Sequence, residues 1–269
     1  ACSWWDYVHA TPEAQRIYLK PNGSTYGMGE RLRNPDYANT LRHLGQHGPE
    51  DFYTGELAQR MMADLSANGS YVTADDLANY QLREAMRVTG TYRGYGIVST
   101  TAPHGGPTLI AILNILEGYD LAALGHNSPT YIYLVSMAMK AAFADRNQTM
   151  ADPEFNDVPV EWMIAKERAA AWREHINAGK PIEASFMPTG TPDTTHVSVV
   201  DSQGNCVALT HSLGASSGVI TPGLGFMYNN SMINFHPLAG HPNSIGPGKG
   251  RTTGMCPTIV TNTAKPLFA

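Results

Sequence analysis

Two threonines, Thr194 and Thr195, begin an alternating stretch that a turn at Gln203-Gly204 joins to a second stretch ending near Ser212. A hydroxyl is a weak nucleophile at neutral pH, but a threonine at the start of a chain has its own base, an α-amino group with a pKa of about 7.7–8.0. The preceding run, MPTGTPD, ends at Asp193 and is rich in Pro, Gly and Thr. A cut between Asp193 and Thr194 would therefore create a nucleophile. The residues alone leave open that Thr194 is only a strand-favouring β-branched residue.

Helix signals occur before residue 180, and strand signals follow residue 194. Proline and cap residues predict helices after Asn34, from Pro49 to near Gly69, after Thr73, and from Ser128. Further helices are predicted from the PHGGP run to Gly118 and over 160–176, and a hairpin is predicted over 86–100 around Arg93-Gly94. Residues 180–193 read as a flexible linker. Helices first and strands later favour an α+β fold over an alternating parallel sheet.

Composition excludes several classes of function. The 269 residues are 42% hydrophobic and 15% charged with a net charge of −5, and no basic cluster suggests binding to nucleic acid. The longest apolar run, 108–116, is about half of a membrane span, and no signal peptide is visible. Three cysteines without a CxxC spacing predict neither a disulfide framework nor a zinc site.

Three other stretches do not match the sequence patterns that their suggested functions require. The stretch GHPNSIGPGKGRTTG resembles a phosphate loop, but Asn243 and Gly250 stand where a glycine and a Ser or Thr are required. His236 and His241 are the one close pair of loop histidines, so no metal site is expected. The run GASSG lacks the order of a nucleophile elbow.

The stretch TTHVSVVDSQGNCVALTHSL (194–213) resembles the start of the small subunit in the γ-glutamyltranspeptidase family of N-terminal nucleophile hydrolases. This resemblance implies a four-layer αββα sandwich. It divides the chain into residues 1–193, the C-terminal part of a large subunit ending in the linker, and 194–269, the start of a small subunit. Similar blocks occur in the same order along nearly the whole chain, at 30–58, 92–121, 137–161, 225–235 and 254–260.

The resemblance also assigns roles to individual residues. It implies that Thr194 attacks the Asp193 carbonyl in self-cleavage and is then acylated by an amide substrate. Ser212 stands where the family has a threonine that supports the nucleophile. Substrate-binding positions are occupied by Asn230, Asn234, Thr253 and Gly254.

The implied reaction is transfer or hydrolysis of γ-glutamyl amides such as glutathione. Water, an amino acid or a peptide would be the acceptor, and the partners are the two subunits of one precursor. No metal and no organic cofactor is implied. A periplasmic or extracellular location agrees with the resemblance. The family's donor-binding arginine and oxyanion glycines fall outside these residues, so this chain alone is expected to lack part of the site.

Departures from the family pattern concentrate in the donor pocket. Asn234 stands where an acid pairs with the donor's α-amino group, and Thr253 and Gly254 stand where paired serines hold its carboxylate. A neutral amide accepts a weaker hydrogen bond from an ammonium than a carboxylate does. An acylase for another acyl group, such as a β-lactam side chain or glutaryl, is therefore an alternative. A catalytically silent homologue is a second alternative, against which the retained hydroxyls of Thr194 and Ser212 argue.

Overall fold

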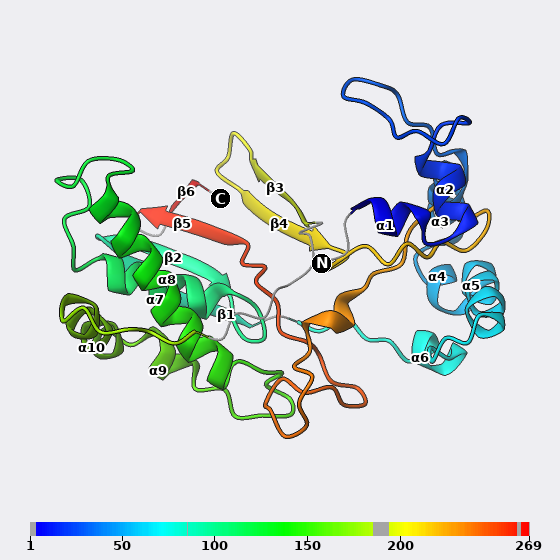
Figure 1. The fold of residues 1–269 in the computed structure, drawn as a ribbon. Coiled ribbons are helices and arrows are strands. Elements are labelled where there is room, and N and C mark those ends of the chain that lie inside the picture. Colours follow the sequence, from blue (N-terminus) through cyan, green and yellow to red (C-terminus); the bar gives the residue numbers. More distant parts are fainter. Residues whose placement is uncertain (1–3, 85, 185–193, 263–264, 269) are drawn as a thin grey trace. The chain divides into compact units, whose positions relative to one another are not determined.

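The computed structural model describes residues 4–84, 86–184, 194–262 and 265–268, which form two compact units (Figure 1). The first unit, called the helical unit below, contains residues up to 84 together with 213–230. The second, called the sheet unit, contains 86–184, 194–212 and 231–268. Each unit thus combines segments that are far apart in the sequence. The mixture of helices and strands agrees with the predicted α+β class. Residues 185–193 of the predicted linker, with Asp193 of the cleavage site, lie outside the described residues. The start of the predicted linker is not loose, because Ile182 is buried in a core cluster with Ile176 of the preceding helix.

Six helices build the described part of the helical unit, and the predicted caps begin two of them. The Asn34 side chain accepts a hydrogen bond from Tyr37 N at 3.0 Å, which satisfies an N–H that the first turn leaves unpaired. Thr73 and Asp76 form a reciprocal capping box, as predicted. The helices are α1 (Trp4–His9), α2 (Pro12–Tyr18), α3 (Pro35–His47), α4 (Asp51–Thr54), α5 (Glu56–Ala67) and α6 (Ala74–Ala78).

The single helix predicted from Pro49 to near Gly69 is wrong, because the chain breaks at Gly55 into α4 and α5. Gly55 has an extended backbone conformation. The Asp51 carboxylate accepts hydrogen bonds from the backbone N–H groups of Glu56 and Leu57, each at 3.1 Å. This carboxylate therefore caps the second helix and stabilises the break.

The loop segment 213–230 packs into the helical unit. Leu224 is fully buried in a cluster with Leu57 and Met61 of α5. The buried Thr40 hydroxyl donates to Leu224 O at 2.8 Å, and Asn34 Nδ2 donates to Gly225 O at 2.7 Å. This irregular segment is therefore part of the core, with side-chain donors satisfying its carbonyl groups.

A four-stranded antiparallel sheet forms the centre of the sheet unit, in the order β1-β2-β5-β6. The predicted hairpin is confirmed as β1 and β2, which turn at Arg93-Gly94, where both residues have positive φ (50° and 85°). Val88 and Ile97 of this hairpin pack on Ile110 of α7. The strands are β1 (Arg87–Tyr92), β2 (Tyr95–Thr100), β5 (Thr258–Asn262) and β6 (Lys265–Phe268).

Helices α7, α8 and α10 share a second core, in which Ile115, Ala138 and Ala169 are almost completely buried. The single helix predicted over 160–176 is wrong, because Ala165 is extended (φ −62°, ψ 137°) and separates α9 from α10. The four helices are α7 (Gly106–Leu116), α8 (Pro129–Thr149), α9 (Val160–Ile164) and α10 (Lys166–Asn177). No helix in the described part of the chain is both long and apolar enough to span a membrane.

The second hairpin pairs β3 (Thr194–Val200) with β4 (Cys206–Ser212) as a separate two-stranded sheet. Its turn is held by Asp201, whose Oδ1 accepts from the backbone N–H groups of Gln203 and Asn205 at 2.9 and 2.8 Å. Strand β4 lies near β5 (Figure 1).

Candidate functional site

Thr194 and Ser212 face each other at the open end of the β3–β4 hairpin. They are the first residue of β3 and the last of β4, and the antiparallel register pairs them directly. Thr194 Oγ1 donates a hydrogen bond to Ser212 Oγ at 2.9 Å. The backbone ladder therefore brings together the two hydroxyls that the sequence assigns to catalysis and orients the Thr194 side chain.

The two faces of this hairpin differ in polarity. On the face of Thr194, the His196 ring is hydrogen-bonded through Nδ1 to Thr210 Oγ1 (2.7 Å) and through Nε2 to Ser198 Oγ (3.0 Å). Both ring nitrogens are thus engaged away from Thr194. Within the described residues, no imidazole or carboxylate hydrogen-bonds the Thr194 hydroxyl. The opposite face exposes apolar side chains, Val197, Val199, Val207 and Leu209.

The four predicted substrate-binding residues fall in different places. Asn230 belongs to the helical unit, where its backbone N–H donates to Leu213 O and Ala215 O at 3.1 and 2.9 Å. Asn234, Thr253 and Gly254 belong to the sheet unit. Asn234 ends the short 3₁₀ helix η1 (Ser231–Asn234), and the other two precede β5. The structure therefore groups three of the four.

Asn243 connects the two segments that carry these residues. Its Nδ2 donates to Asn234 O at 2.8 Å, and its Oδ1 accepts from Thr252 N at 3.1 Å. Its backbone O also accepts from His236 N at 2.8 Å. The residue is 7% exposed, so these bonds have little competition from water. Sequence reasoning used Asn243 only to reject a phosphate loop, because no local pattern shows which backbone groups its amide will reach.

The segment 252–255 is also anchored to the loop before α7. Thr253 N donates to Pro103 O at 3.0 Å, and Gly105 N donates to Met255 O at 2.9 Å. A Cβ on Gly105 would lie 2.6 Å from Gly254 O, so this close approach requires glycine. A Cβ on Gly254 would meet no atom within 4 Å. Gly254 therefore borders open space into which a larger residue could extend.

His236 and His241 stack with ring centroids 3.8 Å apart but form no metal site. His241 Nε2 donates to Asn147 O at 2.9 Å, and its Nδ1 accepts from Asn243 N at 3.1 Å, so both nitrogens have partners. Burial lowers the pKa of the His241 imidazole, and the neighbouring His236 and Lys249 act in the same direction. No group of three or more metal-ligating side chains occurs among the described residues.

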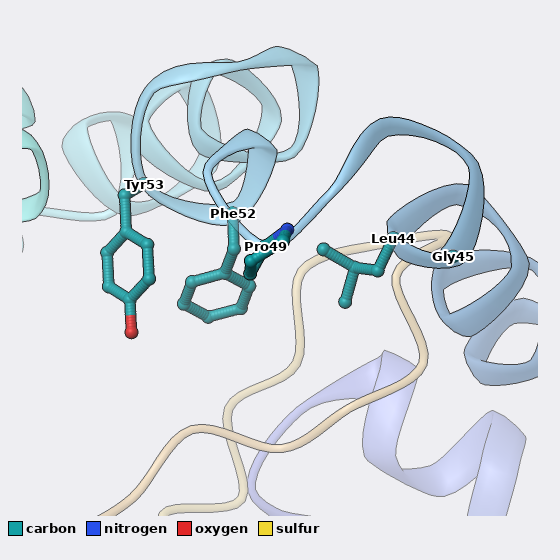
Figure 2. Close-up of a pocket in the computed structure, with 5 residues that line it drawn as sticks. All are labelled: Leu44, Gly45, Pro49, Phe52 and Tyr53. Carbon is teal, nitrogen blue, oxygen red and sulfur yellow. The ribbon is translucent and has the colours of Figure 1, made fainter.

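An apolar pocket of about 490 Å³ lies in the helical unit between α3 and α4. Figure 2 shows Leu44, Pro49 and Phe52 lining it, with the Tyr53 hydroxyl at its edge. Tyr53 stacks on Tyr80 with ring centroids 5.5 Å apart. None of the predicted site residues lines this pocket, and it offers no cluster of polar groups for chemistry.

Comparison with known proteins identifies the class of the chain. The Gamma-glutamyltranspeptidase family matches residues 3–269. The chain is 39% identical over 256 residues to "Acylase ACY 1 proenzyme" of Pseudomonas sp. (strain V22), a match covering 93% of this chain and 46% of the relative. It is 37% identical over 264 residues to "Glutathione hydrolase proenzyme" of Pseudomonas sp. (strain A14), covering 91% of this chain and 46% of the relative.

A solved structure extends this similarity to the fold. The cephalosporin acylase from Bacillus halodurans superposes with a TM-score of 0.81 at 28% identity, covering 97% of this chain and 49% of that one. The chain therefore belongs to the γ-glutamyltranspeptidase family. It spans about half the length of the curated relatives it matches.

Proposed function

We propose that this chain belongs to a self-processing amide hydrolase or acyltransferase in which Thr194 is the nucleophile. The observation that carries the proposal is the direct pairing of Thr194 with Ser212, whose hydroxyls are 2.9 Å apart at the end of the hairpin. Family membership supports it. Both Pseudomonas relatives are named as proenzymes, which agrees with a precursor that is cut before it acts.

In the proposed processing step, Thr194 Oγ attacks the carbonyl carbon of Asp193 and the peptide C–N bond breaks. The resulting ester is hydrolysed by water, which leaves a carboxylate on Asp193 and a free α-amino group on Thr194. This amine supplies the base that the described residues around the hydroxyl do not provide. Ser212 accepts the Thr194 hydrogen bond and so fixes the hydroxyl before either reaction.

In the proposed catalytic step, the α-amine takes the hydroxyl proton while Thr194 Oγ attacks the amide carbonyl of the donor. The same proton then passes to the leaving amine, and an acyl ester remains on Thr194. Water resolves this ester in hydrolysis, and an amino acid or peptide amine resolves it in transfer. Neither step requires a metal or an organic cofactor.

The proposal also covers subunits and architecture. Cleavage would separate residues 1–193 from a small subunit that starts at 194, and we propose that both belong to a four-layer αββα sandwich. The exposed apolar face of the β3–β4 hairpin supports a further layer, because burying one such side chain contributes about 1.5–3 kcal/mol. The relatives contain about twice the length of chain from which that layer could come.

For the donor, we propose γ-glutamyl amides such as glutathione, a class supported by the similarity to a Pseudomonas glutathione hydrolase. An acylase for a different acyl group is the second candidate. The neutral Asn234 and the side-chain-free Gly254 favour it, as does the similarity to two acylases.

The test uses the complete protein and its Thr194→Ala variant. We expect a denaturing gel to show two fragments for the wild type, the smaller beginning TTHVSVV on N-terminal sequencing, and one uncut chain for the variant. Amide hydrolysis by the variant should fall by at least about 10³-fold, because the nucleophile is lost. A different N-terminus, or an uncut wild type that hydrolyses amides, would contradict the assignment. Thr194→Ser is the matched control, since it retains a hydroxyl and should still be cut.

A further inference from the structure

Asp152 is a fully buried carboxylate that the proposed chemistry does not use. It lies in residues 147–156, the end of α8 and the connection that follows, which are called the anchor segment below. Its Oδ1 accepts a hydrogen bond from Glu154 N at 3.1 Å, and its Oδ2 accepts one from Gly250 N. Burying a carboxylate is costly unless such bonds stabilise its charge. One oxygen thus serves the anchor segment itself, and the other holds a residue 98 positions away in the chain.

Two further hydrogen bonds hold the anchor segment against residues 236–250, called the connecting loop below. His241 Nε2 donates to Asn147 O at 2.9 Å, and Asn156 Nδ2 donates to Pro242 O at 3.2 Å. Both segments belong to the sheet unit. The connecting loop is therefore fixed to the anchor segment at its middle and at its last residue.

The connecting loop joins two of the predicted substrate-binding positions. It begins two residues after Asn234 and ends three residues before Thr253. The Asn243 amide links Asn234 O to Thr252 N, as described above. A displacement of Gly250 would therefore pass along the backbone to Thr252 and Thr253, and through the Asn243 amide to Asn234.

Asp201 shows how the same kind of bond acts when it is only local. Its Oδ1 accepts from the backbone N–H groups of Gln203 and Asn205, within one exposed turn. Those bonds shape the turn and reach no other segment. Asp152 makes one bond of this local kind, to Glu154 N, but its second oxygen joins two segments that are distant in the sequence.

We propose that Asp152 is a positioning residue for donor binding, an inference that rests on the proposed function. It is fully buried and so acts through Gly250 rather than by touching a substrate. The anchor segment precedes Thr194 in the chain and the connecting loop follows it. In the proposed processed protein, a carboxylate of the large subunit thus sets the position of a substrate-binding loop of the small subunit.

Asp152→Asn in the complete protein tests the inference, because an amide of the same shape has one acceptor oxygen and can keep only one of the two bonds. The probes are a γ-glutamyl anilide and a glutaryl anilide, and the kinetics use whichever the wild type hydrolyses faster. We expect KM to rise about 10-fold with kcat changed less than about 2-fold, and the cut before Thr194 to remain complete on a denaturing gel. Hydrogen exchange at the Gly250 amide should become about 10-fold faster. Asp157→Asn, which changes an exposed carboxylate of the same connection, is the matched control and should behave like the wild type.

A purely structural role gives a different result, since loss of folded protein lowers kcat and leaves KM unchanged. That result overturns the inference, as does an Asp157→Asn variant whose KM rises equally. If Asp152→Asn does not fold, Asn156→Ala decides, because it removes the bond to Pro242 O and should raise KM about 2- to 3-fold. An unchanged KM there overturns the inference. A wild type that stays uncut and hydrolyses neither anilide would refute the proposed function and the inference with it, whereas the other results refute the inference alone.

Discussion

The end of the β3–β4 hairpin and the loops that carry Asn234 and Thr253 are held in place by different means. Thr194 and Ser212 are aligned by a continuous backbone ladder, so their side chains are not needed to maintain their positions. Asn234 and Thr252 are aligned by the amide of one buried residue, Asn243. We infer that the position of Thr194 tolerates substitution of its neighbours. The link between the segments that carry Asn234 and Thr252 depends on the Asn243 side chain, while backbone bonds to Pro103 and Gly105 hold the second segment against the loop before α7.

Asn243→Ala should show the largest effect after loss of the proposed nucleophile, Thr194. It leaves Asn234 O and Thr252 N without partners in a buried place, which should cost about 2–4 kcal/mol of unfolding free energy. Urea denaturation measures this, and KM for a donor should rise more than kcat falls. Asn243→Asp keeps the acceptor for Thr252 N but sets a buried carboxylate against Asn234 O, so it should also be destabilised, and more so at pH 8 than at pH 5. An Asn243→Ala protein with unchanged stability would show that the loops have other supports.

Asn234→Asp tests whether the loop that carries Asn234 contacts the α-ammonium group of a donor. A carboxylate strengthens a hydrogen bond to an ammonium, so we expect the ratio of kcat/KM for a γ-glutamyl anilide to that for a glutaryl anilide to rise about 10- to 100-fold. Gly254→Ser is a companion variant, since open space beside Gly254 should allow it to fold normally. A wild type that already prefers the glutamyl compound, with a ratio unmoved in Asn234→Asp, contradicts this role for Asn234.

Ser212→Ala tests the end of the β3–β4 hairpin, where the backbone ladder holds Thr194 in place. The backbone ladder remains, so the melting temperature should be nearly unchanged, while kcat/KM should fall about 3- to 10-fold through loss of one neutral hydrogen bond to Thr194. Ser212→Thr, which restores a hydroxyl, should recover most of the activity. A large loss of stability in Ser212→Ala would remove the proposed difference between hairpin and loops.

The smallest expected effect is the pH dependence of thermal stability that arises from His241. Burial lowers the pKa of His241, so its neutral form stabilises the fold above the unfolded pKa of about 6.5, and this contribution is lost as the pH falls below that value. Melting temperatures at pH 7.5 and 5.5 should therefore differ more in the wild type than in His241→Gln. His126→Gln, which changes an exposed histidine in another loop, is the control and should behave like the wild type.

Local signals in the sequence predicted the hairpins and the capped helices, because turn and cap residues act on their immediate neighbours. The breaks at Gly55 and Ala165 were missed because each is compatible with a helix locally. The break at Gly55 is stabilised by Asp51, a contact that periodicity does not report. Within the candidate site, the alternating stretches and the turn between them predicted a hairpin that begins at Thr194, and the family resemblance assigned Ser212 as its supporting hydroxyl. Asn243 and Asp152 depend on contacts between loops, which no short pattern contains.

The segment 213–230 has a consequence for any cut made before Thr194. It follows Thr194 in the chain, yet it is packed into a unit built from residues before residue 85, through Leu224 in the core and Gly225 beneath α3. A Cβ on Gly225 would lie 2.2 Å from Tyr37 N, so the backbone at Gly225 packs tightly against the backbone of α3. After such a cut, the segment 213–230 of the second polypeptide would remain packed in the core of the first. The two polypeptides would therefore stay associated as one particle without a covalent link.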